Sequence, residues 1–109
     1  MKNQVKLAFT GIVVAVLATL PSSLALGQAG ANTYKSKCTM CHAADGSGSS
    51  PAGKAMGAIP FSSPALIKAS DADLIAATTN GKGKMPAYSG KLPAAQIKDV
   101  VAYIRTLQK

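Results

Sequence analysis

Cys38-Thr39-Met40-Cys41-His42 is the stretch around which the rest of this sequence is interpreted, a C-x-x-C-H run. On a helical turn the two cysteines, three residues apart, project from one face. Two thiols placed in this way can form thioether bonds to the two vinyl groups of a porphyrin. The histidine follows directly, and one of its imidazole nitrogens can ligate the iron as the proximal ligand. The run therefore predicts covalent attachment of one c-type haem.

A C-x-x-C pair also occurs in redox-active dithiols, in disulfides and in halves of zinc sites, so the context of the motif has to decide. A thiol–disulfide oxidoreductase that uses Cys38 and Cys41 would need a βαβ context. The sequence contains no alternating strand pattern and no internal repeat. This context favours haem attachment over thiol chemistry.

The second axial ligand decides what such a haem can do, because an open position favours small-molecule chemistry and two ligands favour electron transfer. His42 is the only histidine, which excludes a second histidine ligand from the same chain. Met1 precedes the predicted mature chain and Met40 lies inside the C-x-x-C loop on the proximal side, while Met56 stays a candidate but follows the motif closely. Met85 lies in a loop rich in Gly and Lys, where a methionine has little core to fill. We therefore predict Met85 as the distal ligand of an electron carrier. The alternative function is that of a sensor, in which a small molecule displaces Met85 from the iron.

The first 27 residues have the pattern of a secretory signal peptide, with two lysines, an apolar run of 14 residues at 7–20 and a small-residue end. That run is shorter than the roughly 20 residues needed to span a bilayer. We expect cleavage between residues 25 and 29, after Gly27 in the favoured register. The mature domain would then be residues 28–109, exported to the periplasm and without stable membrane insertion.

Positive charge dominates the predicted mature chain of 109 − 27 = 82 residues. The signal peptide removes two of the 12 Lys and Arg residues and none of the 4 acidic residues. The formal charge of the mature chain is therefore 10 − 4 = +6. Lys82, Lys84 and Lys91 flank the Met85 loop and could steer the protein toward redox partners with acidic docking surfaces. The alternative is that these lysines only solvate the loop. An exported chain with 5% aromatic residues is not expected to bind nucleic acid.

Helical patterns occupy three stretches, and the remainder is rich in Gly, Ser and Pro. The last stretch is the clearest, because apolar residues recur at three- and four-residue spacing from Ile97 to Leu107. Ser70 can cap the middle helix, and Gly81 ends it. The predicted helices are 28–37, 70–80 and 93–107, and the predicted loops are 43–53 and 82–92. Irregular chain is expected to continue from the first loop to residue 64, with at most one short helical turn in it. The fold class is therefore all-α.

Taken together, these features resemble the small soluble class I c-type cytochromes over residues 29–109. Cys38, Cys41 and His42 match the family's haem motif, and the sequence from Gly81 to Pro86 matches its distal-ligand loop around Met85. Residues 101–105, Val-Ala-Tyr-Ile-Arg, match its final helix, and Gly30 and Tyr34 stand where the family has the small and aromatic pair of its first helix.

The resemblance implies a class I cytochrome c fold, three to five helices wrapped round one covalently bound haem. It implies a periplasmic single-electron carrier that cycles Fe(II)/Fe(III), not an enzyme, and we expect a monomer. Gly30 and Tyr34 should cross the final helix near Val100 and Tyr103. The carbonyl that fixes the proximal histidine in this family could come from Pro51 or from Pro60, and the last helix lacks the family's hydroxyl cap.

Overall fold

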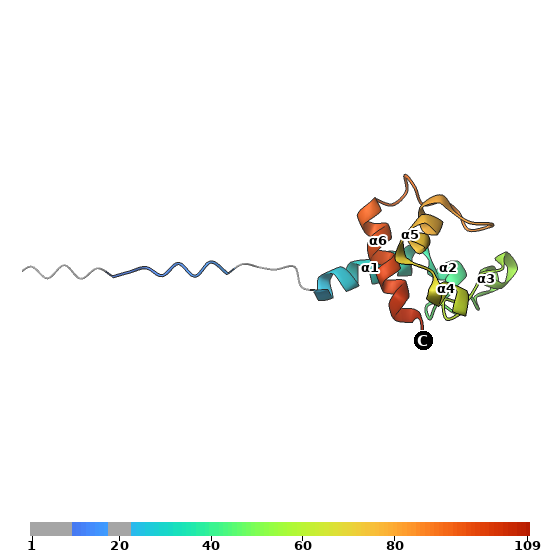
Figure 1. Cartoon of the computed structure of the whole chain (residues 1–109), viewed down its shortest axis with the longest axis horizontal. Coiled ribbons are helices and arrows are strands. Elements are labelled where there is room, and N and C mark those ends of the chain that lie inside the picture. Colours follow the sequence, from blue (N-terminus) through green and yellow to red (C-terminus); the bar gives the residue numbers. More distant parts are fainter. Residues whose placement is uncertain (1–9, 18–22) are drawn as a thin grey trace, which may run out of the picture.

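The computed structural model describes residues 10–17 and 23–109, without the side chains of residues 23–26. The parts of the predicted signal peptide at 1–9 and 18–22 therefore lie outside the described residues. Residues 10–17 have no regular secondary structure, and no strand occurs in the described part of the chain. The helices are α1 (Ser23–Lys37), α2 (Thr39–His42), α3 (Pro51–Met56), α4 (Pro64–Lys68), α5 (Asp71–Asn80) and α6 (Ala94–Leu107) (Figure 1). None of these described helices is long and apolar enough to cross a membrane.

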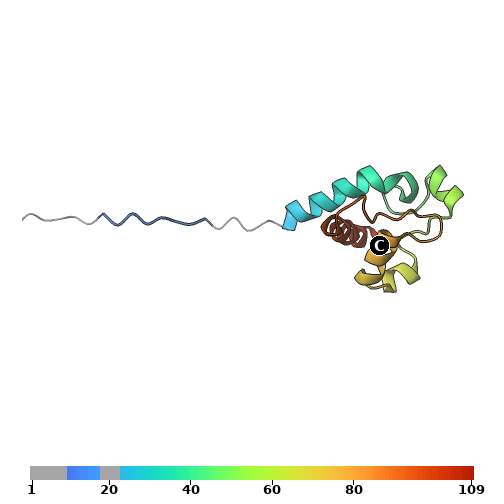
Figure 2. The ribbon, with the colours of Figure 1, turned by 90° about the horizontal axis from the view of Figure 1, so that it is seen from above.

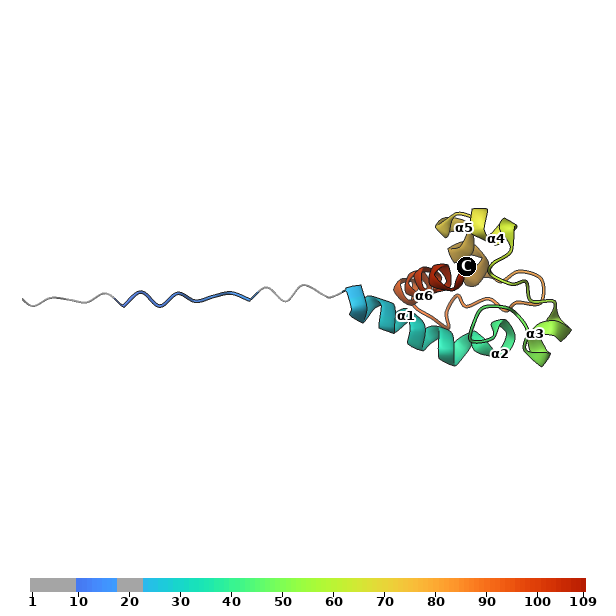
Figure 3. The ribbon, with the colours of Figure 1, turned by 90° about the horizontal axis from the view of Figure 1, so that it is seen from below.

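The C-x-x-C-H run forms the continuation of the first helix, because α2 follows α1 after a single residue (Figure 3). The Cys38 N–H donates to the Tyr34 carbonyl at 2.9 Å, and the His42 N–H donates to the Cys38 carbonyl at 3.0 Å. Both bonds span four residues, as in an α-helix. The helical turn expected for the two cysteines is therefore present. With α1 and α2 taken as one helix, the fold has five helices in the described residues, within the predicted three to five.

Gly30 is the point at which α1 crosses α6, and Figures 2 and 3 show α1 running across α6, which is viewed nearly along its axis. A Cβ atom at Gly30 would collide with the carbonyl oxygen of Asp99 and stand 3.2 Å from the Cβ of Tyr103. Tyr34, one turn later, is 1% exposed, and its ring centroid lies 5.3 Å from that of Tyr103. The predicted crossing is confirmed. The core cluster around it comprises Tyr34, Phe61, Val100, Val101 and Ile104.

α5 begins and ends where the sequence predicts. The Ser70 hydroxyl accepts from the Asp73 N–H at 3.0 Å, and the Asp73 carboxylate accepts from the Ser70 N–H at 3.4 Å, which completes a capping box. Gly81 ends the helix with φ +76°. Arg105 then fixes α5 against α6 through an ion pair with Asp71 at 2.9 Å.

The prediction of a continuous loop over residues 43–53 is wrong at its end, because α3 begins at Pro51. Ser50 accepts a hydrogen bond from the Gly53 N–H at 3.0 Å, and Pro51 occupies the first helical turn, where its missing N–H costs nothing. Two smaller boundaries also differ. α1 starts at Ser23 rather than at residue 28, so it includes the predicted cleavage region, and Pro93 is the N-cap of α6 rather than its first helical residue.

Candidate cofactor site

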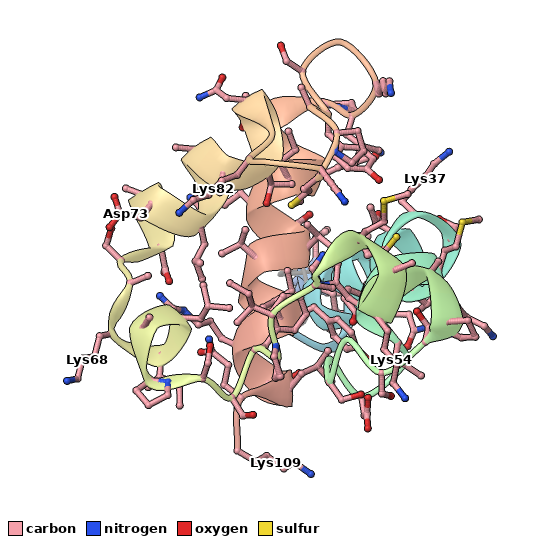
Figure 4. The ribbon with its side chains drawn as sticks, turned by 90° about the vertical axis from the view of Figure 1, so that its right-hand side faces the viewer. Lys37, Lys54, Lys68, Asp73, Lys82 and Lys109 are labelled. Atoms are coloured by element: carbon pink, nitrogen blue, oxygen red, sulfur yellow. The ribbon has the colours of Figure 1, made fainter. Side chains whose placement is uncertain are left out.

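A cavity of about 730 Å³ lies between the C-x-x-C-H segment, the loop after α3, α5, the Met85 loop and α6. Cys38, Cys41, His42 and Met85, the four residues predicted from the sequence, all line it. Lys37 and Lys82 also line it, and Figure 4 shows them on two separate elements of the face turned to the viewer. The remaining wall is largely apolar and includes Met56, Ile59, Phe61, Leu66, Leu74, Val100 and Ile104.

The C-x-x-C-H turn is held in place by hydrogen bonds to its backbone. Ser50 donates to the Met40 carbonyl at 2.6 Å and stands 3.2 Å from the Cys41 carbonyl oxygen, so the start of α3 is tied to the turn. The Tyr34 hydroxyl donates to the Ala43 carbonyl at 2.6 Å on the other side. These contacts fix the backbone from which both thiols and the imidazole project.

His42 lies at the end of α2 with its ring stacked on Phe61, at a centroid distance of 4.7 Å and an interplanar angle of 21°. Its Nδ1 is buried and has no hydrogen-bond partner among the described residues, so neither Pro51 nor Pro60 supplies a carbonyl to it. The Pro60 carbonyl accepts from the Ser63 N–H instead. Burial lowers the pKa of His42, which favours the neutral imidazole that metal ligation requires.

The two cysteines are free thiols, and the surroundings of Cys38 do not favour redox chemistry at its sulfur. Burial raises the pKa of Cys38 to about 11, so this thiol stays protonated at neutral pH and is a poor nucleophile. The described residues contain no group of three or more His, Cys, Asp or Glu side chains that could hold a metal ion. The raised pKa of Cys38 disfavours a dithiol enzyme.

The Met85 loop turns back on itself beside the cavity. The Lys82 N–H donates to the Met85 carbonyl at 3.2 Å, and the Met85 N–H donates to the Lys82 carbonyl at 3.0 Å. Gly81 makes this turn possible, since it has positive φ and a Cβ there would stand 2.7 Å from the Met85 carbonyl oxygen and 2.9 Å from the Ala87 nitrogen. The half-buried Met85 side chain is thereby presented to the cavity.

Three residues of the site were not assigned a role in the sequence. Phe61 stacks on His42, Tyr88 lines the cavity and donates to the Lys37 carbonyl at 3.0 Å, and Lys37 borders the cavity with Lys82 and Lys84. Phe61 and Tyr88 lie in irregular segments, where no periodic spacing marks a buried aromatic residue. The position of Lys37, directly before Cys38, was a usable signal, because a residue adjacent to an attachment cysteine lies close to the attached group.

The residues of the cavity fit a covalently attached haem. The volume is in the range of about 300–1,000 Å³ typical of cofactor and ligand sites. Two free thiols and an imidazole line one part of it, a thioether lines another, and the wall is mainly apolar. The ring of His42 is held by its stacking on Phe61 rather than by a hydrogen bond from Nδ1 to a described residue.

Fold and site together define a small c-type cytochrome. The family described as "Cytochrome C oxidase, cbb3-type, subunit III" matches residues 25–104, and the chain belongs to this family of c-type cytochrome domains. Membership implies covalently bound haem c with its iron, and a function in electron transport rather than catalysis.

Several cytochromes c6 are similar to this sequence over 70–95% of its length. Cytochrome c6 of Nostoc sp. strain PCC 7120 is 33% identical over 105 residues, which cover 95% of this chain and 92% of the relative. Cytochrome c6 of Leptolyngbya boryana is 35% identical over 79 residues, 70% of this chain and 86% of the relative. The cbb3-type cytochrome c oxidase subunit CcoP of Azospirillum brasilense is 34% identical over 85 residues, but this chain spans only 29% of its length.

Solved structures confirm the class I cytochrome c fold. The KustC0563 c-type cytochrome superposes with a TM-score of 0.68 and 28% identity, over 73% of this chain and 98% of the other. A chain of the Kuenenia stuttgartiensis reducing HAO-like protein complex gives a TM-score of 0.70 at 20% identity, over 86% of this chain and 48% of that one, and it supports the fold alone.

Proposed function

We propose that this protein is a periplasmic single-electron carrier with one haem c, attached through Cys38 and Cys41 and ligated by His42 and Met85. The observation that carries the proposal is that these four side chains, which the sequence separates by up to 47 positions, line one largely apolar cavity. When bound, the haem iron supplies the reversible exchange of one electron between Fe(II) and Fe(III).

Each of the four residues has a distinct task. Cys38 and Cys41 hold the cofactor covalently, so it cannot dissociate. The neutral imidazole of His42, at the end of α2 and with its ring stacked on Phe61, would ligate the iron. The soft thioether of Met85 would be the second iron ligand and would favour the ferrous state, which would raise the reduction potential. A closed coordination shell suits a carrier, because no position is left open for a small-molecule substrate.

The cellular setting of the proposal rests on residues 1–27. Two lysines followed by a 14-residue apolar run support export and cleavage near Gly27, and the carrier would then work as a monomer in the periplasm. The lysines around the cavity support docking to acidic surfaces of redox partners. Lys37, Lys82 and Lys84 all border it, and all three are exposed.

The visible spectrum of protein exported by a cell that matures c-type cytochromes tests the proposal first. We expect colour that stays with the polypeptide after acid–organic extraction, and a low-spin reduced spectrum that carbon monoxide does not change. A colourless protein with a reducible Cys38–Cys41 disulfide would instead support thiol chemistry. Ready binding of carbon monoxide by the reduced protein would support a sensor.

Methionine substitutions test the ligand assignment. Met85→Ala should open the sixth position, so the reduced protein binds carbon monoxide and the reduction potential falls. Met56→Ala is the matched control, because Met56 lines the same cavity and is 53% exposed. We expect it to leave both properties unchanged. The reverse result would transfer the ligand role to Met56.

A further inference from the structure

Tyr88 connects the Met85 loop to the segment that carries the cysteines. It follows Met85 by three residues and lines the same cavity. Its hydroxyl donates to the carbonyl oxygen of Lys37 at 3.0 Å, across 51 positions of sequence. Lys37 is the last residue of α1 and directly precedes Cys38. One hydrogen bond therefore joins the two sides of the cofactor site.

The Lys37 carbonyl is available for this bond because of the break between α1 and α2. An unbroken helix would direct the Cys41 N–H to it, but that N–H donates to the Cys38 carbonyl at 3.3 Å. The last carbonyls of a helix lack partners within the helix and take them from elsewhere. The Tyr88 hydroxyl provides that partner.

The backbone of Tyr88 serves the end of α5 in the same way. If α5 were longer, the Lys82 N–H would donate to the Thr78 carbonyl. It donates to the Met85 carbonyl instead, and the Tyr88 N–H donates to the Thr78 carbonyl at 3.1 Å. The Tyr88 carbonyl accepts from Lys91 and Leu92, both at 3.0 Å, just before α6. Tyr88 thus joins the ends of α1 and α5 and the approach to α6, and its backbone is fixed independently of its hydroxyl.

We propose that Tyr88 is a positioning residue for Met85. The hydrogen bond from the Tyr88 hydroxyl to the Lys37 carbonyl keeps the loop of residues 82–92 closed over the cavity. The strength of this closure then sets how readily an outside ligand replaces the Met85 sulfur. The inference rests on the proposed ligation by Met85. It adds that a contact made outside the coordination shell controls access to the iron.

The test compares Tyr88→Phe with wild type in the haem-loaded protein. The variant removes one oxygen atom and keeps the ring in the cavity wall. We expect imidazole to bind the oxidised protein roughly 2–10-fold faster, the range that corresponds to losing the net contribution of one hydrogen bond. Amide hydrogen exchange at Met85 should accelerate by a similar factor, while exchange in the core of α6 stays unchanged.

Tyr103→Phe is the matched control. Its ring packs on Tyr34, its hydroxyl makes no hydrogen bond within the part of the chain that the structure describes, and it does not line the cavity. Removing this hydroxyl should change neither imidazole binding nor exchange at Met85.

Two results would overturn the role of Tyr88. Imidazole binding and Met85 exchange equal to wild type would show that the bond does not hold the loop. Exchange that rises equally in all helices would show a general stability contact instead. A wild-type protein that binds carbon monoxide freely when reduced would be a different failure, because it would refute the ligation by Met85 itself.

Discussion

Gly30 shows how the absence of one side chain determines the packing of the two longest helices. The space where its Cβ would lie is taken by the backbone of Asp99, so α1 and α6 approach more closely than any other residue would allow. This close approach brings Tyr34 against Val100, Val101 and Tyr103 in the core. Tyr34 in turn holds the backbone just after His42, so the crossing and the cofactor site are linked.

Gly30→Val should therefore destabilise the protein by about 1–3 kcal/mol, because a rigid backbone carbonyl cannot move aside for the added carbons. Thermal unfolding followed by circular dichroism measures the loss. Asn32→Val is the control, since it adds a β-branched residue to an exposed position of the same helix. Equal melting temperatures for the two variants would contradict the close approach.

At the level of single residues, the sequence predicted four residues that line the cavity, but not the contacts that support them. Haem attachment and iron ligation require particular residue types at particular spacings, so Cys38, Cys41, His42 and Met85 could be proposed without a structure, and all four line one cavity. Phe61 and Tyr88 act through contacts that depend on the path of irregular chain segments, and no spacing rule marks such contacts. The unpartnered Nδ1 of His42 could not have been foreseen either, because it depends on where the Pro60 carbonyl points.

At the level of elements, sequence patterns located α5 and α6 to within one residue and missed the short helices α3 and α4. Long amphipathic helices with caps have several independent signals, whereas α3 has six residues, includes a glycine and lies within a Ser- and Gly-rich segment. The signal that was present is local. Ser50 followed by Pro51 has the form of an N-cap and a first helical residue.

Ser50→Ala should cost about 1–2 kcal/mol, since it removes the cap of α3 and the 2.6 Å bond to the Met40 carbonyl. Ser63→Ala is the matched control. Ser63 is the N-cap of α4, but its hydroxyl makes no cap bond and is buried without a partner among the described residues. We expect the control to be neutral or slightly stabilising. Chemical denaturation of the haem-loaded variants compares the two, and equal losses would contradict the role of Ser50.

At the level of the whole molecule, the buried core is small relative to the cavity beside it. The buried hydrophobic residues in the described part of the chain are Tyr34, Phe61, Ile97, Val100, Val101 and Ile104. The cavity of about 730 Å³ lies against several of these, and an apolar hollow of that size is unfavourable unless it is filled. We therefore expect the fold to depend on the group that fills the cavity, and the short chain and the attachment motif lead to the same expectation.

The protein with Cys38→Ser and Cys41→Ser should lose cooperative thermal unfolding, because no covalent bond then retains the cofactor in the cavity. Far-ultraviolet circular dichroism during heating detects the change. Met40→Ala is the control in the same segment, since Met40 is 78% exposed, and this variant should unfold like the wild type. A sharp transition in the double variant at the wild-type temperature would mean that the protein core suffices alone.

Net charge acts on the molecule as a whole, whereas docking depends on where the charges lie. The chain carries a formal charge of +8, and Lys82 and Lys84 lie at the cavity while Lys68 and Lys98 do not (Figure 4 labels Lys68 and Lys82). Replacing Lys82 and Lys84 with Gln should slow electron transfer to an acidic redox partner most at low ionic strength, where screening is weakest.

The double variant of Lys68 and Lys98 to Gln provides the comparison, because it lowers the net charge by the same two units at positions away from the cavity. Stopped-flow rates at increasing salt concentration give the ionic-strength dependence of each protein. If Lys82 and Lys84 form the docking surface, their replacement should flatten that dependence more than the control does. Equal slopes would mean that the partner responds only to the net charge, and that the two lysines merely solvate the Met85 loop.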